Sequence, residues 1–293
     1  MTSSRPSTSS LSRRDAAGAW GLRAAAAVGG GISLLIVSFL VIEAMPLLGR
    51  IGPARFVTDG AWHPTQGLFD LSPMLWGTVL VSGGAMLIAA PLGLASAVFV
   101  NLYAPRAVAS GYRLVLEVLA GVPSVVYGFW GLMVLVPWIG ALRPPGASLL
   151  AGVLVLALMV TPTMAVIVDA AMAQVPAPEL HAALALGLSR ATTLRAVIWP
   201  RVRSGAWTAL ILTLGRALGE TMAVLMVCGN VVQTPGSVFD PVRTLTANMA
   251  LEMAYATGDH RGALFVTGLF LMVLVAVLVL AADAVAARGD VHA

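Results

Sequence analysis

Long apolar runs separated by short polar segments dominate the chain. Each run is long enough to cross about 30 Å of hydrocarbon as a helix, and this pattern predicts an all-α membrane protein with six transmembrane helices. The first run is too long for a signal-peptide core, so we expect it to remain in the protein as a transmembrane helix. The predicted spans are 24–48, 75–101, 113–140, 148–170, 205–233 and 261–284.

The polar segments between and around these runs divide the chain further. Residues 1–23 are rich in Ser, Thr and Arg without a periodic apolar face, which predicts a disordered cytoplasmic tail. The segment 24–74 then holds the first transmembrane helix and an extracytoplasmic loop. A membrane core follows over 75–284, with a long cytoplasmic loop at 175–204, and residues 285–293 form a second cytoplasmic tail.

Composition and charge support a membrane location and fix an expected orientation. Hydrophobic residues make up 59% of the chain and charged residues only 10%, against about 25% charged in soluble domains. All 17 basic residues are arginine. Eleven lie in segments that are cytoplasmic if both termini are inside, five lie outside, and Arg216 lies within a span, so the arginine bias favours both termini in the cytoplasm.

Missing residue types, and residues that lie far apart in the sequence, exclude several classes of function. Without lysine, the chain cannot itself be a P-loop ATPase. Its arginines are spread between apolar segments, which argues against nucleic acid as a partner. Cys228 is the only cysteine, and the four histidines are far apart, so we expect no metal site. No motif brings together a nucleophile, a base and an orienting group, so we do not expect the chain to be an enzyme. The histidines are His63, His181, His260 and His292.

The cytoplasmic loop predicts a helix, a turn and a second helix. Glu179 suits a first turn, where a carboxylate interacts favourably with the helix dipole. Gly187 can adopt the left-handed conformation that ends a helix, and Ser189 can cap the next one. We expect that second helix to run to Trp199 and to end before Pro200. The pair could equally be an ordinary amphipathic connector on the membrane surface.

The spacing of this loop resembles the cytoplasmic signature of ABC importer permeases. In that family the signature reads Glu-Ala-Ala, three residues, Gly, nine residues, then Ile-x-Leu-Pro, and it forms the helices that dock into the ATPase subunit. Here His181 replaces the glutamate and Trp199 replaces the leucine. The resemblance implies a type I ABC importer permease (MetI-like) fold. It also implies ATPase coupling through Glu179, His181, Ala182, Ala183, Gly187 and Pro200.

The predicted fifth span contains a charged pair. Arg216 lies 11 residues beyond Gly205, or about 16 Å along a helix, which places it near the bilayer midplane. Such a charge costs at least about 2.5 kcal/mol, and Glu220, one helical turn later, can pair with it. Gly215 and Gly219 allow another backbone to approach closely. Both a structural ion pair and a functional pair facing a translocation path fit this pattern.

Two strings sharpen the resemblance. Residues 215–230, GRALGETMAVLMVCGN, and 121–132, GVPSVVYGFWGL, look like the PstC-type permease subunit of the bacterial phosphate ABC transporter. The resemblance implies that Arg216 and Glu220 lie on the phosphate pathway. It also implies an inner-membrane location in contact with membrane lipid, no cofactor bound by this chain, and three kinds of protein partner. The implied partners are a PstA-type permease, two ATPase subunits that use ATP, and an extracytoplasmic phosphate-binding protein.

Other substrates and driving forces remain open at this level. The same machine could carry sulfate, molybdate or another oxyanion. Glu220 could accept a hydrogen bond from protonated phosphate and repel sulfate, which has no proton to donate. A secondary transporter driven by protons through Glu220 would instead work without an ATPase partner.

Overall fold

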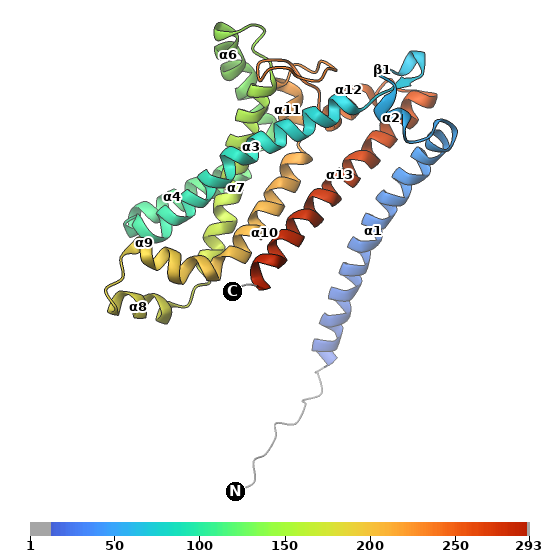
Figure 1. The fold of residues 1–293 in the computed structure, drawn as a ribbon. Coiled ribbons are helices and arrows are strands. Elements are labelled where there is room, and N and C mark those ends of the chain that lie inside the picture. Colours follow the sequence, from blue (N-terminus) through green and yellow to red (C-terminus); the bar gives the residue numbers. More distant parts are fainter. Residues whose placement is uncertain (1–12, 292–293) are drawn as a thin grey trace.

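The computed structural model describes residues 13–291, and most of them are helical (Figure 1). Residues 1–12, His292 and Ala293 lie outside the described residues. The helices are α1 (Arg13–Ile51), α2 (Arg55–Thr58), α3 (Ser72–Val98), α4 (Arg106–Gly121), α5 (Ser124–Trp130), α6 (Val136–Leu142), α7 (Leu149–Met172), α8 (Ala177–Ala185), α9 (Arg190–Thr193), α10 (Trp199–Leu218), α11 (Met222–Val227), α12 (Leu245–Glu252) and α13 (Gly258–Val291).

Short irregular elements join these helices. A hairpin in the first loop pairs β1 (Trp62–His63) with β2 (Leu68–Phe69) around a 3-10 turn, η1 (Pro64–Gln66). Three π-helical turns are inserted elsewhere, and each forms a continuous helical path with the α-helix before it. They are η2 (Phe99–Tyr103), η3 (Gly131–Leu135) and η4 (Leu194–Ile198).

Five of the six predicted spans are present as helices long and apolar enough to cross a membrane. In Figure 1 the start of α1, the end of α13 and α8 lie at one end of the bundle, and the hairpin and α12 lie at the other. The chain is therefore a multi-pass membrane protein. The five spans are Ala19–Ile51, Ser72–Tyr103, Ser124–Leu142, Leu149–Met172 and Gly258–Asp283.

The predicted span 113–140 is wrong at its start. Helix α4 ends at Gly121, and Val122 is extended, with ψ 131°. Pro123 explains the break, because the ring of a proline disfavours helical conformation in the residue before it. The membrane-spanning helix therefore begins at Ser124, and α4 is a separate helix that packs on α7.

The predicted span 205–233 is not one of these five, because its helix is broken. Helix α10 begins earlier than expected, at Trp199, and ends at Leu218. Residues 219–221 are not helical, and α11 resumes at Met222. Gly219 favours such a break, because it gains no packing from a side chain and loses more backbone entropy than other residues in a helix.

The prediction of a disordered tail over 1–23 is wrong from Arg13 onward, where α1 begins. Three alanines between Asp15 and Trp20 favour helix and extend the apolar span toward its N-terminus. The C-terminal tail is likewise helical as far as Val291.

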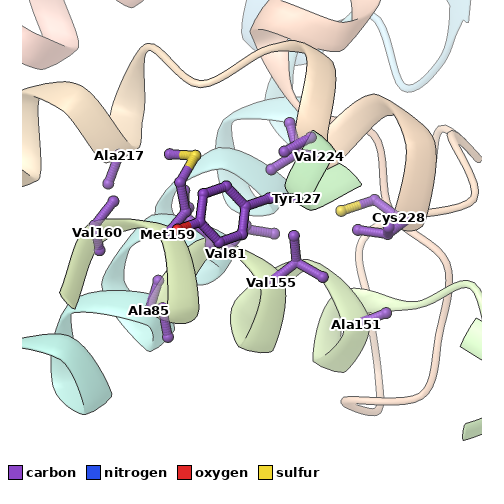
Figure 2. Close-up of a cluster of buried hydrophobic side chains, with 14 of the residues drawn as sticks. Val81, Ala85, Tyr127, Ala151, Val155, Met159, Val160, Ala217, Val224 and Cys228 are labelled. Carbon is purple, nitrogen blue, oxygen red and sulfur yellow. The ribbon is translucent and has the colours of Figure 1, made fainter. Parts of the chain in front are cut away.

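The main core lies where α3 and α7 pack along each other. Figure 2 shows Val81 and Ala85 of α3 facing Val155 and Met159 of α7, with the ring of Tyr127 over them. A second cluster joins α1, the hairpin and α13. Outside these clusters, apolar side chains of α1 and α4 are exposed, as expected for helices that meet lipid or another membrane subunit.

Candidate pathway and coupling sites

The cytoplasmic loop has the predicted helix, turn and helix. Helix α8 ends at Ala185, and Gly187 follows with a φ of +69°, the left-handed conformation that glycine adopts without strain. The Leu188 N–H donates to the Ala183 carbonyl at 3.1 Å and closes the turn. The Ser189 hydroxyl then accepts from the Thr192 N–H at 3.2 Å and caps α9. These local predictions are confirmed.

The predicted end of the second helix before Pro200 is wrong. Helix α9, the π-turn η4 and α10 follow one another without a break. The Trp199 N–H donates to the Leu194 carbonyl, five residues earlier. Pro200 follows where this π-turn joins α10, and the wider turn accommodates a residue without an N–H inside a continuous helix. The loop is therefore joined by continuous helix to Arg216.

An ion pair fastens α8 to the start of α10. Arg201 Nη2 lies 2.6 Å from Glu179 Oε1, and Arg201 Nε lies 3.3 Å from Oε2. The Glu179 carboxylate is thus engaged within the chain. Sequence reasoning missed Arg201, since the two residues are 22 positions apart.

The remaining signature residues on α8 divide into an inner and an outer set. Ala183 is buried, whereas His181 and Ala182 are exposed. Leu184 and Leu186 are also exposed, which leaves an apolar surface on α8 that no other part of the described chain covers.

Arg216 lies at the edge of the main core, in the last turn of α10. Its neighbour Ala217 is buried beside Val160 in Figure 2, while Arg216 itself is exposed on the surface of the single chain. Arg216 Nη1 donates to Thr163 Oγ1 of α7 at 3.1 Å. The guanidinium is therefore held beside the bundle instead of being sealed within it.

The predicted one-turn relation between Arg216 and Glu220 is wrong, because α10 ends at Leu218 and Glu220 lies in the break. Glu220 is half-buried, and its Oε1 accepts from the Ala223 N–H at 3.0 Å, at the start of α11. The two charged side chains thus have different partners within the described residues. The ion pair expected from helical spacing is replaced by two separate hydrogen bonds.

Two hydroxyls from other helices donate to carbonyls at the break. Ser82 Oγ of α3 donates to the Ala217 carbonyl at 3.2 Å. Thr246 Oγ1 of α12 donates to the Glu220 carbonyl at 2.8 Å. Sequence reasoning missed both residues. Their only signal was a hydroxyl within an otherwise apolar segment.

A second charged cluster lies at the opposite end of the bundle from α8. Glu252 is only 7% exposed and accepts through Oε1 from Arg243 Nη1 at 2.6 Å. Its Oε2 accepts from Trp62 Nε1 at 2.9 Å and lies 2.8 Å from His260 Nε2. The cluster lines a cavity of about 640 Å³ and ties the hairpin, α12 and α13 together.

The Asp169 carboxylate, near the end of α7, also has a partner that sequence did not identify. Arg113 of α4 binds it through Nε at 2.8 Å and Nη2 at 3.0 Å, and Asn101 Nδ2 donates to Oδ1 at 2.6 Å. These bonds fasten α4 to α7. Across residues 13–291 no group of three or more His, Cys, Asp or Glu side chains is placed to hold a metal ion.

The broken helix, the capped loop and α7 lie within one matched region. The model of binding-protein-dependent transport system inner membrane components matches residues 89–290, more than half of the chain. The chain belongs to this family. It is accordingly a permease subunit of an ABC importer and not an enzyme.

Individual relatives and a solved structure agree with this assignment. The permease is 38% identical over 250 residues to the probable ABC transporter permease protein YqgH of Bacillus subtilis, covering 83% of this chain and 81% of the relative. It is 34% identical over 241 residues to the phosphate transport system permease protein PstC of Mesorhizobium japonicum, covering 75% and 74%.

The fold is confirmed by structure. A chain from the crystal structure of a bacterial ABC transporter involved in the import of alginate superposes with a TM-score of 0.67 at 15% identity, covering 94% of this chain and 98% of that one. The permease thus has the predicted MetI-like fold, with five candidate membrane spans among the described residues, and the helix expected as a further span at 205–233 is broken at 219–221.

Proposed function

We propose that this permease is the PstC-type subunit of an ATP-driven phosphate importer in a bacterial inner membrane, with both termini in the cytoplasm. The observation that carries the proposal is the exposed guanidinium of Arg216, held by one hydroxyl beside a broken span. The similarity to phosphate permeases named PstC supports phosphate as the substrate.

An arginine at this position needs an anionic partner. A charge within the bilayer costs at least about 2.5 kcal/mol on insertion scales, and the described residues place no carboxylate against Arg216 to offset that cost. A guanidinium also presents a planar fork of donors that matches phosphate oxygens. A single arginine compensates only part of the charge on phosphate, so we place the pathway between this chain and a PstA-type permease.

Glu220 has a second task in this proposal. Its Oε1 is occupied by the Ala223 N–H, whereas no hydrogen bond within the described residues occupies Oε2. That oxygen can accept a hydrogen bond from a protonated phosphate and repels sulfate, which has no proton at neutral pH. Glu220 therefore favours phosphate over sulfate.

Coupling to ATP runs through α8. Its exposed residues, His181, Ala182, Leu184 and Leu186, form a surface that fits a groove on an ATPase subunit. The Glu179–Arg201 pair passes force from α8 to α10, and the continuous helix carries it to Arg216. Two ATPases and an extracytoplasmic phosphate-binding protein complete the machine, and the permease itself binds no cofactor.

The test uses the complete transporter reconstituted in vesicles. Labelled phosphate is added on the side of the membrane where the binding protein docks, and ATP is supplied on the side of the ATPases. Replacement of Arg216 by alanine removes charge-assisted hydrogen bonds and should lower uptake at least about tenfold. Arg143→Ala is the matched control, because Arg143 is an exposed arginine that lies over the ring of Phe239, away from the proposed pathway.

Three outcomes would overturn the proposal or part of it. Unchanged phosphate uptake by Arg216→Ala would remove the pathway role of the arginine. Preference for sulfate or molybdate over phosphate would point to another oxyanion. Uptake that persists without the ATPases and follows a proton gradient would indicate a secondary transporter.

A further inference from the structure

The Thr163 hydroxyl does not make the hydrogen bond that five other threonines in the described helices make. Those five donate their hydroxyl proton to the carbonyl four residues earlier, which is the usual local bond in a helix. Thr163 instead accepts from Arg216 Nη1 at 3.1 Å. The threonines with the usual bond are Thr58, Thr78, Thr161, Thr208 and Thr267.

The proton of the Thr163 hydroxyl is therefore uncommitted. Within residues 13–291 no protein oxygen accepts it, and a hydroxyl that accepts through one lone pair still has one O–H to donate. Thr163 is half-buried, so this unused donor lies at the wall of the bundle and not in bulk solvent.

The group that contacts the Thr163 hydroxyl has further donors available. Arg216 uses only Nη1 in a hydrogen bond within the described chain, which leaves further N–H groups beside the hydroxyl. A cluster with spare N–H and O–H donors and a positive charge suits an anion with several oxygens.

We propose that Thr163 is a second residue of the phosphate pathway, where it positions the Arg216 guanidinium and donates its own hydroxyl proton to an anion oxygen. The inference rests on the proposed function, since it needs Arg216 to meet the anion. Position 163 suits the task, because α7 is fixed along its length by packing on α3, and the threonine branch restricts the hydroxyl to few rotamers.

The chain supplies a matched control two residues away. Thr161 lies on the same helix and is also half-buried, but its hydroxyl donates to the Ala157 carbonyl at 2.7 Å. Valine has nearly the shape of threonine without the hydroxyl. Thr163→Val therefore removes the proposed anion contact, Thr161→Val removes a local helix bond, and Thr163→Ser restores the hydroxyl without the methyl group.

The experiment measures phosphate uptake and ATP hydrolysis by the complete transporter in vesicles, for these three variants and Arg216→Ala. We expect Thr163→Val to lower the maximal uptake rate about tenfold, since one hydrogen bond to a charged group is lost. The KM for phosphate should stay constant, because the binding protein captures the anion first. Thr163→Ser and Thr161→Val should retain most of the uptake.

The outcomes separate this inference from the proposed function. If Arg216→Ala abolishes uptake while Thr163→Val leaves it unchanged, the role of Thr163 is overturned and the proposed function stands. Equal losses in Thr163→Val and Thr161→Val, or no recovery in Thr163→Ser, would show a packing effect and also overturn it. Normal uptake by Arg216→Ala would overturn both proposals together.

Discussion

Two arginine and glutamate sets in this permease are built from the same residue types but differ in how completely they are bonded. Arg243 donates to the Asn230 carbonyl, to Asn248 and to Glu252, and its side chain is 18% exposed. Arg216 is exposed and has one hydroxyl as its hydrogen-bond partner within the described chain.

The difference indicates two roles. A buried ion pair whose atoms are nearly all bonded to protein fastens elements together and has little capacity for a ligand. A cation with spare donors, held at the edge of a membrane bundle, has that capacity. We therefore assign the Arg243 set to structure and the Arg216 set to transport, and the two can be separated by measuring stability and uptake on the same variants.

The largest expected effect is on stability and comes from Arg243→Ala. This variant leaves the Glu252 carboxylate buried without its cation, which costs about 3–5 kcal/mol. Arg216→Ala should change stability by no more than about 0.5 kcal/mol, as is usual for exposed positions. Thermal unfolding of the purified transporter measures both. A stable Arg243→Ala protein, or an unstable Arg216→Ala protein, would reverse the assignment.

Substitutions of Glu252 and Glu220 should likewise affect stability and transport separately, with a smaller effect than the arginine substitutions. Glu252→Gln weakens the bonds to Arg243 and His260 and should destabilise the permease by about 1–3 kcal/mol. Glu220→Gln keeps an oxygen that can accept from the Ala223 N–H, so stability should hold while the phosphate-to-sulfate uptake ratio falls. An unchanged ratio would remove the selectivity role of Glu220.

The Glu179–Arg201 pair extends the comparison to an exposed ion pair with a proposed mechanical role. Exposed pairs contribute about 0–1 kcal/mol, so Glu179→Gln should unfold almost like the wild type. It should nevertheless lower phosphate uptake per ATP hydrolysed, and exchanging the charges in Glu179→Arg with Arg201→Glu should restore part of it. Unchanged coupling in Glu179→Gln would limit this pair to a structural contact.

The smallest effect concerns a local pair in the first loop. Hydrogen bonds from Arg55 lower the pKa of Asp59, which also accepts from the Phe69 N–H. A lowered pKa in the folded state means that this contribution is complete above the unfolded pKa of about 3.9 and is lost as the pH falls below it. Wild type should melt slightly above Asp59→Asn at pH 7, and the gap should close under acid conditions. A gap that is independent of pH would contradict this.

Sequence patterns predicted the parts of this molecule that local chemistry determines. Apolar length located five spans, and Gly187 and Ser189 placed the turn and the cap on α8 and α9, because a left-handed glycine and an N-cap act within a few residues. The signature spacing identified the importer family.

These sequence patterns could not predict contacts between segments that lie far apart in the chain. The carbonyls at the break after Leu218 accept from the hydroxyls of Ser82 and Thr246, which come from helices far away in sequence. Helical spacing alone therefore paired Arg216 with Glu220. The partners of Arg201 and Asp169 were missed for the same reason, since neither pair shares a helix.

The central claim, that Arg216 faces an aqueous anion pathway, is tested most directly by placing a cysteine there. The native chain is the control, because its only cysteine, Cys228, is 1% exposed and should not react. In the assembled transporter, Arg216→Cys should be modified by a small charged thiol reagent during ATP-driven cycling. Modification only by an apolar, membrane-soluble maleimide, or by neither reagent, would show that position 216 faces lipid or closed packing and would contradict the claim.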